Sequence, residues 1–188
     1  EIFTMKIFIT GATGFIGSKL CEYLGNRNEI YGLIRKHKYE PENIKPVQGD
    51  LNKSSYFKDI PQDTECIIYL AQSLKYRNFP SGSNDMLEVN VVAPLKLMQW
   101  AVENKMKRFI YASTANVYGN AISPFTEETI PEPNSFYGET KFTAEKLLRY
   151  YSDYINLDIL RIFTVYGPYQ KNMLVPNLIK LVEEGQTV

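Results

Sequence analysis

Tyr137 and Lys141 are the residues of this sequence best suited to chemistry, because four positions separate them in a segment of helical period. Positions i and i+4 of a helix share a face, so we expect the phenol and the ammonium to point into one cleft. A phenol of ordinary pKa, about 10, is a poor acid–base at neutral pH, and a fixed cation beside it lowers that pKa. In an arbitrary helix this spacing more often marks a half-buried ring beside a solvated lysine.

A glycine-rich segment, residues 10–17, joins an apolar run to a segment of helical period. Its first glycine permits a tight turn, its second lets a pyrophosphate approach the backbone, and its third lets the helix pack against the strand. The N–H groups at the helix start can then receive phosphate charge. A merely convenient strand-to-helix turn is the alternative. The predicted cofactor contacts in this segment are Gly11, Thr13, Gly14, Phe15, Ile16 and Gly17.

The end of the second apolar run decides between cofactors in a dinucleotide-binding fold, because a carboxylate there would accept from the ribose 2′-hydroxyl of NAD. Arg35 and Lys36 stand at this point instead. Both could pair with the 2′-phosphate of NADP. A solvated basic loop would look the same, and with that alternative open the sequence favours NADP over NAD.

Short apolar runs alternate with longer segments of helical period along the chain. The runs are apolar on both parities, as expected of parallel strands buried on both faces. They predict strands at residues 5–10, 30–34, 66–70, 108–112 and 157–162, and a weaker strand is expected at residues 46–47. The helical periods predict crossover helices at 15–24, 86–104, 136–154 and 175–184, with a short helix after Asn52. This order predicts an α/β fold with a doubly wound parallel sheet, the Rossmann fold, with ligands at the carboxyl ends of the strands.

Charge and composition exclude several classes of protein. The 188 residues include 21 basic and 21 acidic side chains, so there is no broad basic surface and nucleic acid is not an expected partner. No apolar run approaches the roughly 18 residues that span a bilayer, and the N-terminus lacks the order of a secretory signal, so we expect no membrane association and a cytoplasmic location. Cys21 and Cys66 are isolated, which predicts reduced core thiols and no metal site.

Together these motifs resemble the extended short-chain dehydrogenase/reductases, the NAD-dependent epimerase/dehydratase family, over residues 5–185. The resemblance is carried by the G-x-x-G-x-x-G spacing, the Tyr-x-x-x-Lys pair, the Val-Tyr-Gly that follows the fifth run, and the Tyr-Gly-Pro at 166–168. It implies that Tyr137 and Lys141 are catalytic and that Lys141 also holds the nicotinamide ribose. Thr114 would bond the reacting oxygen of the substrate, with Ser113 as the alternative.

The resemblance also implies cofactor contacts outside the glycine-rich segment. Asp50 and Leu51 match an Asp-apolar pair beside the adenine ring, although Asp50 could equally cap the next helix. Leu70 and Ala71 match a pattern of small residues against which the phosphates and ribose lie, and Gln72 departs from that pattern.

Other positions match the family in part. Asn90 matches an asparagine that bonds the main chain of neighbouring strands, but Pro94 follows it where the family has threonine. The pair at 115–116 is Ala-Asn, whereas the 4,6-dehydratases have Asp-Glu, so dehydration is not expected. Thr164 replaces an asparagine that faces the substrate in epimerases, which weakens any specific nucleotide-sugar assignment. Arg161 is expected to brace its loop.

The resemblance implies reversible hydride transfer at a carbinol or keto carbon. An epimerase acting on a nucleotide sugar is the first hypothesis, and an NADPH-dependent carbonyl reductase is the second because of the basic pair after the second strand. A truncated dinucleotide-binding module without turnover is the third, because family members continue into a C-terminal substrate lobe that this chain is expected to lack.

The expected domain covers residues 5–188, with residues 1–4 foreign to it. Relatives often dimerise through their two long helices, here 86–104 and 136–154, in a four-helix interface. Their outer faces are expected to carry Met98, Tyr150 and Tyr151. Packing beneath a missing lobe would explain the same apolar faces.

Overall fold

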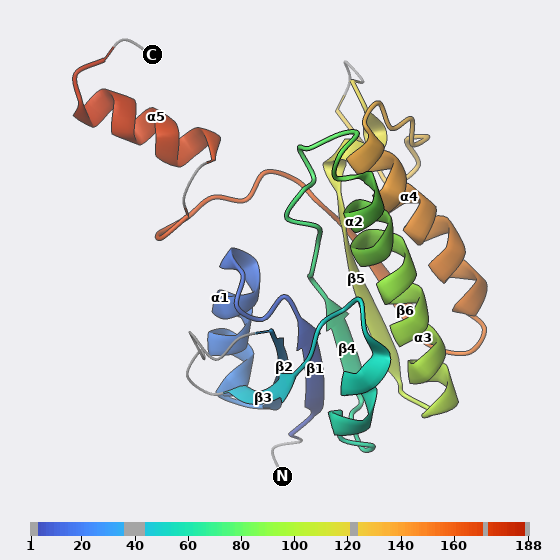
Figure 1. Ribbon diagram of the computed structural model, residues 1–188. Coiled ribbons are helices and arrows are strands. Elements are labelled where there is room, and N and C mark those ends of the chain that lie inside the picture. Colours follow the sequence, from blue (N-terminus) through green and yellow to red (C-terminus); the bar gives the residue numbers. More distant parts are fainter. Residues whose placement is uncertain (1–3, 36–43, 121–123, 171–172, 187–188) are drawn as a thin grey trace.

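The computed structural model describes residues 4–35, 44–120, 124–170 and 173–186 (Figure 1). Its centre is a sheet in which every pair of neighbouring strands is parallel. The strands are β1 (Lys6–Thr10), β2 (Glu29–Ile34), β3 (Ile44–Gln48), β4 (Cys66–Tyr69), β5 (Arg108–Thr114) and β6 (Asn156–Ile162). Their order, β3-β2-β1-β4-β5-β6, is the doubly wound order that the sequence predicts.

The segments between the strands form helices on both faces of the sheet. The α-helices are α1 (Phe15–Gly25), α2 (Ser83–Leu87), α3 (Ala93–Glu103), α4 (Phe136–Leu148) and α5 (Leu174–Glu183). Short 3₁₀ turns are η1 (Ser54–Asp59), η3 (Ala115–Tyr118) and η4 (Arg149–Tyr151). Figure 1 shows α1 on one face of the sheet and α2, α3 and α4 on the other. This arrangement buries both faces of the central strands, as a parallel sheet requires.

The predicted helix at 86–104 is not a continuous α-helix. Between α2 and α3 the chain forms a π-helical segment, η2 (Glu88–Val92), in which the Ala93 N–H donates to the Glu88 carbonyl. Pro94 follows at the start of α3 and has no N–H to offer the turn before it. A missing donor of this kind favours a local change of helical period.

Two apolar clusters make up the core. The larger lies between the sheet and the α3–α4 side and includes Phe8, Leu97 and Tyr111. The smaller lies beneath α1 and includes Cys21 and Cys66. Both thiols are buried, as predicted, and burial raises the pKa of each to about 11. Within the described ranges no three metal-ligating side chains gather at one place, and no helix there has the length and apolar character needed to cross a bilayer.

The prediction that all strands are buried on both faces is wrong for β6. This strand is one of the two edges of the sheet, and none of its residues is buried; Leu160 is 48% exposed. The predicted crossover helix at 175–184 forms as α5, but none of its residues is buried and Figure 1 shows it apart from the sheet. The outer face of β6 is exposed because α5 does not cover it.

The expected place of Met98 on an outer helix face is also wrong. Met98 is fully buried in the larger cluster together with Leu97 and Ala101. Residues 97, 98 and 101 share one arc of α3, and this arc faces the sheet. Tyr150 is 81% exposed and Tyr151 is half-buried, so the expectation holds for Tyr150.

Two leucine substitutions, one in the core and one on the exposed strand β6, test this description of the packing. Leu97→Ala should lower the free energy of unfolding by about 2–5 kcal/mol, because it empties space in a closed core. Leu160→Ala removes the same atoms from a half-exposed edge and should cost less than about 1 kcal/mol. Urea unfolding of both variants measures the difference, and equal losses would contradict this description of β6.

Candidate active site

Those predicted site residues that the structure describes lie at or after the carboxyl ends of strands, or within the first two turns of α1 and α4. The topological switch point lies between β1 and β4, where the chain changes direction across the sheet. The two strand ends are joined there, because the Ala71 N–H donates to Thr10 Oγ1 at 3.3 Å and the Leu70 N–H donates to the Thr10 carbonyl at 3.2 Å. Leu70 and Ala71 are half-buried beside the glycine turn.

The glycine turn has the shape that a pyrophosphate needs. Gly11 has a φ of +74°, and a Cβ there would come within 2.9 Å of the Ala71 nitrogen. A Cβ at Gly17 would overlap the Gly11 carbonyl, so the first turn of α1 lies directly on the loop. Thr13 and Gly14 are exposed, and the N-cap Gly14 provides no side-chain cap for the N–H groups of α1. These residues fit a dinucleotide, whose phosphates the N–H groups would hold.

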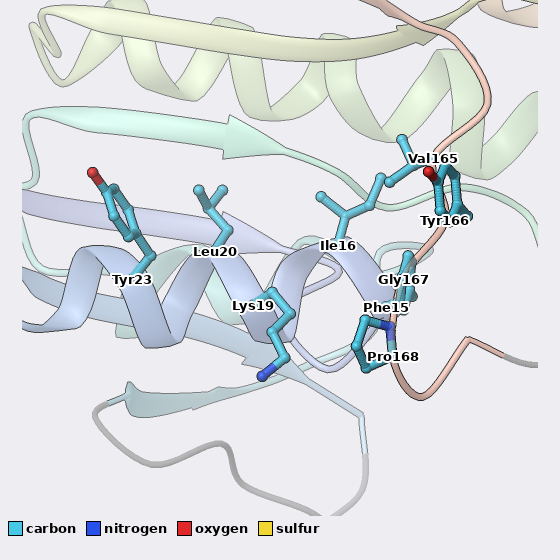
Figure 2. Close-up of a pocket in the computed structure, with 9 residues that line it drawn as sticks. All are labelled: Phe15, Ile16, Lys19, Leu20, Tyr23, Val165, Tyr166, Gly167 and Pro168. Carbon is cyan, nitrogen blue, oxygen red and sulfur yellow. The ribbon is translucent and has the colours of Figure 1, made fainter.

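The side chains of Phe15 and Ile16 face a different space from the phosphate cradle. Between α1 and the segment after β6 lies a cavity of about 420 Å³. Its lining residues, drawn in Figure 2, are Phe15, Ile16, Lys19, Leu20, Tyr23, Val165, Tyr166, Gly167 and Pro168. The backbone of Phe15 and Ile16 is therefore the part of these residues suited to a phosphate.

The predicted contacts Arg35, Asp50 and Leu51 follow the strands β2 and β3. Arg35 directly follows β2 and is exposed, whereas Lys36 lies outside the described residues. Asp50 accepts a hydrogen bond from the Asn52 N–H at 3.0 Å, so its side chain closes a turn before η1. The N-cap of η1 is Lys53, so Asp50 is not the helix cap itself. Leu51 is half-buried against the larger core cluster.

Tyr137 enters the site from the first turn of α4. Ser135 caps this helix by accepting from the Gly138 N–H at 3.1 Å. A Cβ at Gly138 would come within 2.6 Å of the Asn116 carbonyl oxygen, so glycine lets α4 approach the end of β5. The Tyr137 hydroxyl donates to Gln72 Oε1 at 2.7 Å, and the Tyr76 ring packs 5.5 Å from the Tyr137 ring.

The pKa of Tyr137 does not change in the expected direction. Burial raises it to about 12, and a hydrogen bond with the Thr114 side chain acts against this rise. Among the described side chains, Thr114 lowers the pKa of this phenol and Tyr76 raises it. The prediction that Lys141 lowers this pKa is wrong for the protein chain by itself, which keeps Tyr137 protonated.

The structure separates the two candidate hydroxyls at the end of β5. Ser113 is 5% exposed and donates to Glu145, so its hydroxyl is occupied inside the core. Thr114 is half-buried, hydrogen-bonds Tyr137, and accepts from the Asn116 N–H at 3.2 Å. Of the two hydroxyls, the one on Thr114 lies beside the phenol.

Lys141 lies one turn further along α4 and is 2% exposed. Its Nζ lies 4.2 Å from the centre of the Tyr111 ring. The pKa of Tyr111 is raised by burial and also by Tyr137. Both members of the predicted pair therefore face the same side chain of β5. Burial lowers the pKa of Lys141 to about 7, and Glu145 at i+4 partly opposes this shift.

Glu145 is a buried charge that the sequence analysis did not single out. Arg161 neutralises it through hydrogen bonds from Nε at 3.1 Å and from a terminal nitrogen at 2.8 Å, and also donates to the Tyr118 hydroxyl at 2.8 Å. Arg161 thus links β6 to α4 and to the segment after β5, whereas bracing of its own loop, the expected role, stays a prediction. Asn90 is structural as predicted, because its side chain accepts from the Ser73 N–H at 3.0 Å and donates to Thr140 Oγ1 at 3.1 Å.

The contacts of Gln72, Gly138 and Glu145 were missed for different reasons. Gln72 was noted only as a departure from a pattern, and its contact with Tyr137 joins residues 65 positions apart. Gly138, next to Tyr137, was a local signal for a close helix approach. Glu145 lies four residues after Lys141, a spacing that indicates interaction on one helix face.

The buried Lys141 ammonium predicts a pH-dependent stability. The pKa of about 7 in the folded chain lies below the ordinary value of 10.5, so burial of the charge costs stability fully below pH 7. Between pH 7 and pH 10.5 the folded chain loses this proton and the cost fades. Lys141→Met should therefore stabilise the protein most at pH 7 and below, with a gain that falls toward pH 10.5 by about 1.4 kcal/mol per pH unit.

Thermal and urea unfolding across this pH range measures the gain. Lys146→Met, on the exposed side of the same helix, is the matched control and should show no such trend. A gain for Lys141→Met that is constant with pH would contradict the buried charge.

The chain is similar to several known proteins in sequence and in structure. The chain is 31% identical to the uncharacterized UDP-glucose epimerase YtcB of Bacillus subtilis, over 94% of this chain and 62% of that protein. It is 29% identical, with a TM-score of 0.84, to UDP-glucuronic acid 4-epimerase from Bacillus cereus in complex with UDP-glucuronic acid and NAD, over 97% of this chain and 64% of that one. It is 32% identical, with a TM-score of 0.83, to MoeE5 in complex with UDP-glucose and NAD, over 97% and 62%.

The chain thus spans less than two thirds of the length of these relatives. The model of one family, described as the NAD dependent epimerase/dehydratase family, matches residues 7–188, nearly the whole chain. The chain therefore belongs to the NAD-dependent epimerase/dehydratase family.

Proposed function

We propose that this chain is the cofactor-binding and proton-transferring part of an NAD-dependent epimerase that acts on a nucleotide sugar. The observation that carries the proposal is the place of the Tyr137 phenol, which is held by Gln72 at 2.7 Å and whose pKa the Thr114 side chain lowers, at the same sheet edge as the glycine turn. The solved relatives in complex with UDP-glucose or UDP-glucuronic acid and NAD support the substrate class.

The proposed site residues each have a role. Gly11, Gly14 and Gly17 shape the turn that would hold the pyrophosphate, and the exposed Thr13 beside them would border it. Leu70 and Ala71 form the surface beneath the ribose and phosphates. Asp50 and Leu51 border the adenine, which Asp50 can contact through the oxygen that its turn leaves free. A bound NAD would supply the hydride acceptor and donor, and the positive charge of its oxidised nicotinamide would favour a nearby phenolate.

Tyr137 moves the proton of the reacting hydroxyl. With a pKa of about 12 its phenol is protonated, which is the form that gives a proton to a keto oxygen. Thr114 holds the same oxygen, and Gln72 holds the phenol through its carbonyl. Lys141 supplies a cation to the ribose hydroxyls and to the phenolate when the phenol loses its proton.

Removing the phenolic oxygen tests this assignment. Tyr137→Phe should lower turnover with UDP-glucose by about 10²–10⁴-fold, because the proton donor is lost, while NAD affinity stays nearly unchanged. Tyr150→Phe removes the same atom from an 81% exposed tyrosine that follows α4 and should change neither. Retained turnover in Tyr137→Phe would reject the assigned proton donor.

An NADPH-dependent carbonyl reductase is the second candidate, and the exposed Arg35 after β2 favours it. The family is NAD-dependent and the solved relatives cited above hold NAD, so the preference for NADP stays a prediction. Arg35→Ala should weaken NADP binding about tenfold and leave NAD binding unchanged, because a single charge–phosphate pair is lost.

Calorimetric titration with both cofactors measures this preference. Arg27→Ala, an exposed arginine at the amino end of β2, is the matched control. A chain that binds NADP no better than NAD before substitution would contradict the NADP prediction.

A homodimer is part of the same proposal. A groove between α3 and α4 is lined by Val92, Leu95, Lys96, Gln99, Leu147, Tyr150 and Tyr151, and its apolar atoms could pack on the same helices of a second copy. Activity of the chain on its own, the domain limits at 5 and 188, and a cytoplasmic location stay predictions.

A further inference from the structure

Pro94 leaves two carbonyl groups of the preceding helix without their usual donors. In an α-helix the N–H of residue 94 would donate to the Asn90 carbonyl, and proline has none. The Ala93 N–H, which would donate to the Val89 carbonyl, donates to Glu88 instead. Buried carbonyls in this situation need other donors, because an unpaired buried polar group is costly.

Two buried phenols supply these donors. The Tyr69 hydroxyl, from β4, donates to the Val89 carbonyl at 2.6 Å. The Tyr111 hydroxyl, from β5, donates to the Asn90 carbonyl at 2.9 Å. The rings lie 5.8 Å apart, and both side chains are fully buried. Hydrogen bonds from the neighbouring strands β4 and β5 therefore attach the π segment to the sheet at the Val89 and Asn90 carbonyls.

Only one of these phenols also faces the predicted catalytic pair. The Lys141 ammonium lies 4.2 Å from the centre of the Tyr111 ring, a distance at which the negative face of an aromatic ring attracts a cation. The backbone of α4 is held at the same place, since Asn90 donates to Thr140 and Thr140 donates to the Tyr137 carbonyl at 2.8 Å.

The geometry points to Tyr111 as a positioning residue for Lys141. Its hydroxyl fixes the π segment whose Asn90 holds α4, and its ring receives the ammonium that α4 carries. The part of this role that concerns catalysis rests on the function proposed above, whereas the placement of the ammonium does not.

Few charged or titratable groups act on Lys141. Glu145 on α4 favours the ammonium, and Arg161 on β6 offsets part of that charge by pairing with Glu145. Tyr111 on β5 provides the ring face, and its own pKa is raised by burial and by Tyr137 and Glu145. Removing the Tyr111 ring should therefore make the ammonium less stable.

The pKa of Lys141, followed by NMR of the chain labelled with ¹³C at lysine Cε, tests this role. The Lys141 signal is the one lost in Lys141→Met. Tyr111→Leu should lower the pKa of Lys141 by about half a unit or more, and Tyr111→Phe, which keeps the ring, should leave it unchanged. Tyr69→Leu is the matched control, since it removes the neighbouring phenol and its carbonyl bond but no ring beneath an ammonium.

Affinity for NAD gives the functional readout. Tyr111→Leu should weaken NAD binding about tenfold, with recovery in Tyr111→Phe and no loss in Tyr69→Leu. A wild-type chain that binds no NAD would overturn the proposed function, and the pKa of Lys141 would still decide the role of Tyr111. An equal pKa shift in Tyr69→Leu and Tyr111→Leu, or none in Tyr111→Leu, would overturn that role.

Two further variants keep the test decisive if Tyr111→Leu does not fold. Fluorinated phenylalanine at position 111 keeps the ring shape but weakens its negative face, so the pKa of Lys141 should fall relative to Tyr111→Phe, and an unchanged pKa would overturn the role.

Pro94→Ala restores a backbone N–H, so Tyr111→Phe should lower the melting temperature less in that background than in the native one. Equal losses in both backgrounds would contradict the link between Pro94 and the Tyr111 hydroxyl.

Discussion

The site depends on the burial of one ammonium group, that of Lys141, against an aromatic ring. Burial alone opposes the charge and lowers the pKa of Lys141 to about 7, while Glu145 at i+4 supports it. The ring of Tyr111 provides a negative face on the side of the sheet. With a pKa of about 7, the Lys141 amine is protonated in about half of the molecules at neutral pH. Burial holds it at a fixed place, and everything proposed for the phenol and the cofactor requires that place.

The sheet topology brings the other parts to the same edge. Because β1 and β4 are neighbours although β2 and β3 separate them in sequence, the glycine turn and the Leu70–Ala71 segment meet at the switch point. The next strand, β5, carries Tyr111 and Thr114. The helix α4 packs over this strand and carries Tyr137 in its first turn. Gly138 allows this helix to lie directly against the backbone at Asn116.

Local patterns in the sequence predicted the fold well, because parallel strands and their crossover helices follow from apolar periodicity and from the glycine turn. The errors concern contacts between distant segments. The outer face of β6 and the apolar face of α5 carry the expected patterns, but α5 does not pack on the sheet. For the site, the spacing of Tyr137 and Lys141 indicated a shared face but not the direction of the pKa shifts. Those depend on burial and on Gln72, Tyr111 and Glu145, which only the folded chain brings together.

The pKa of the Tyr137 phenol, with and without NAD, tests the central claim most directly. It can be followed by NMR of the chain labelled with ¹³C at tyrosine Cζ, with Tyr137→Phe used to identify the signal. The account predicts a value of about 12 for the chain alone and a value at least about one unit lower with saturating NAD, because positive charge then lies beside the phenolate. A pKa that is the same in both conditions would show that the cofactor does not bind beside this phenol and would contradict the account.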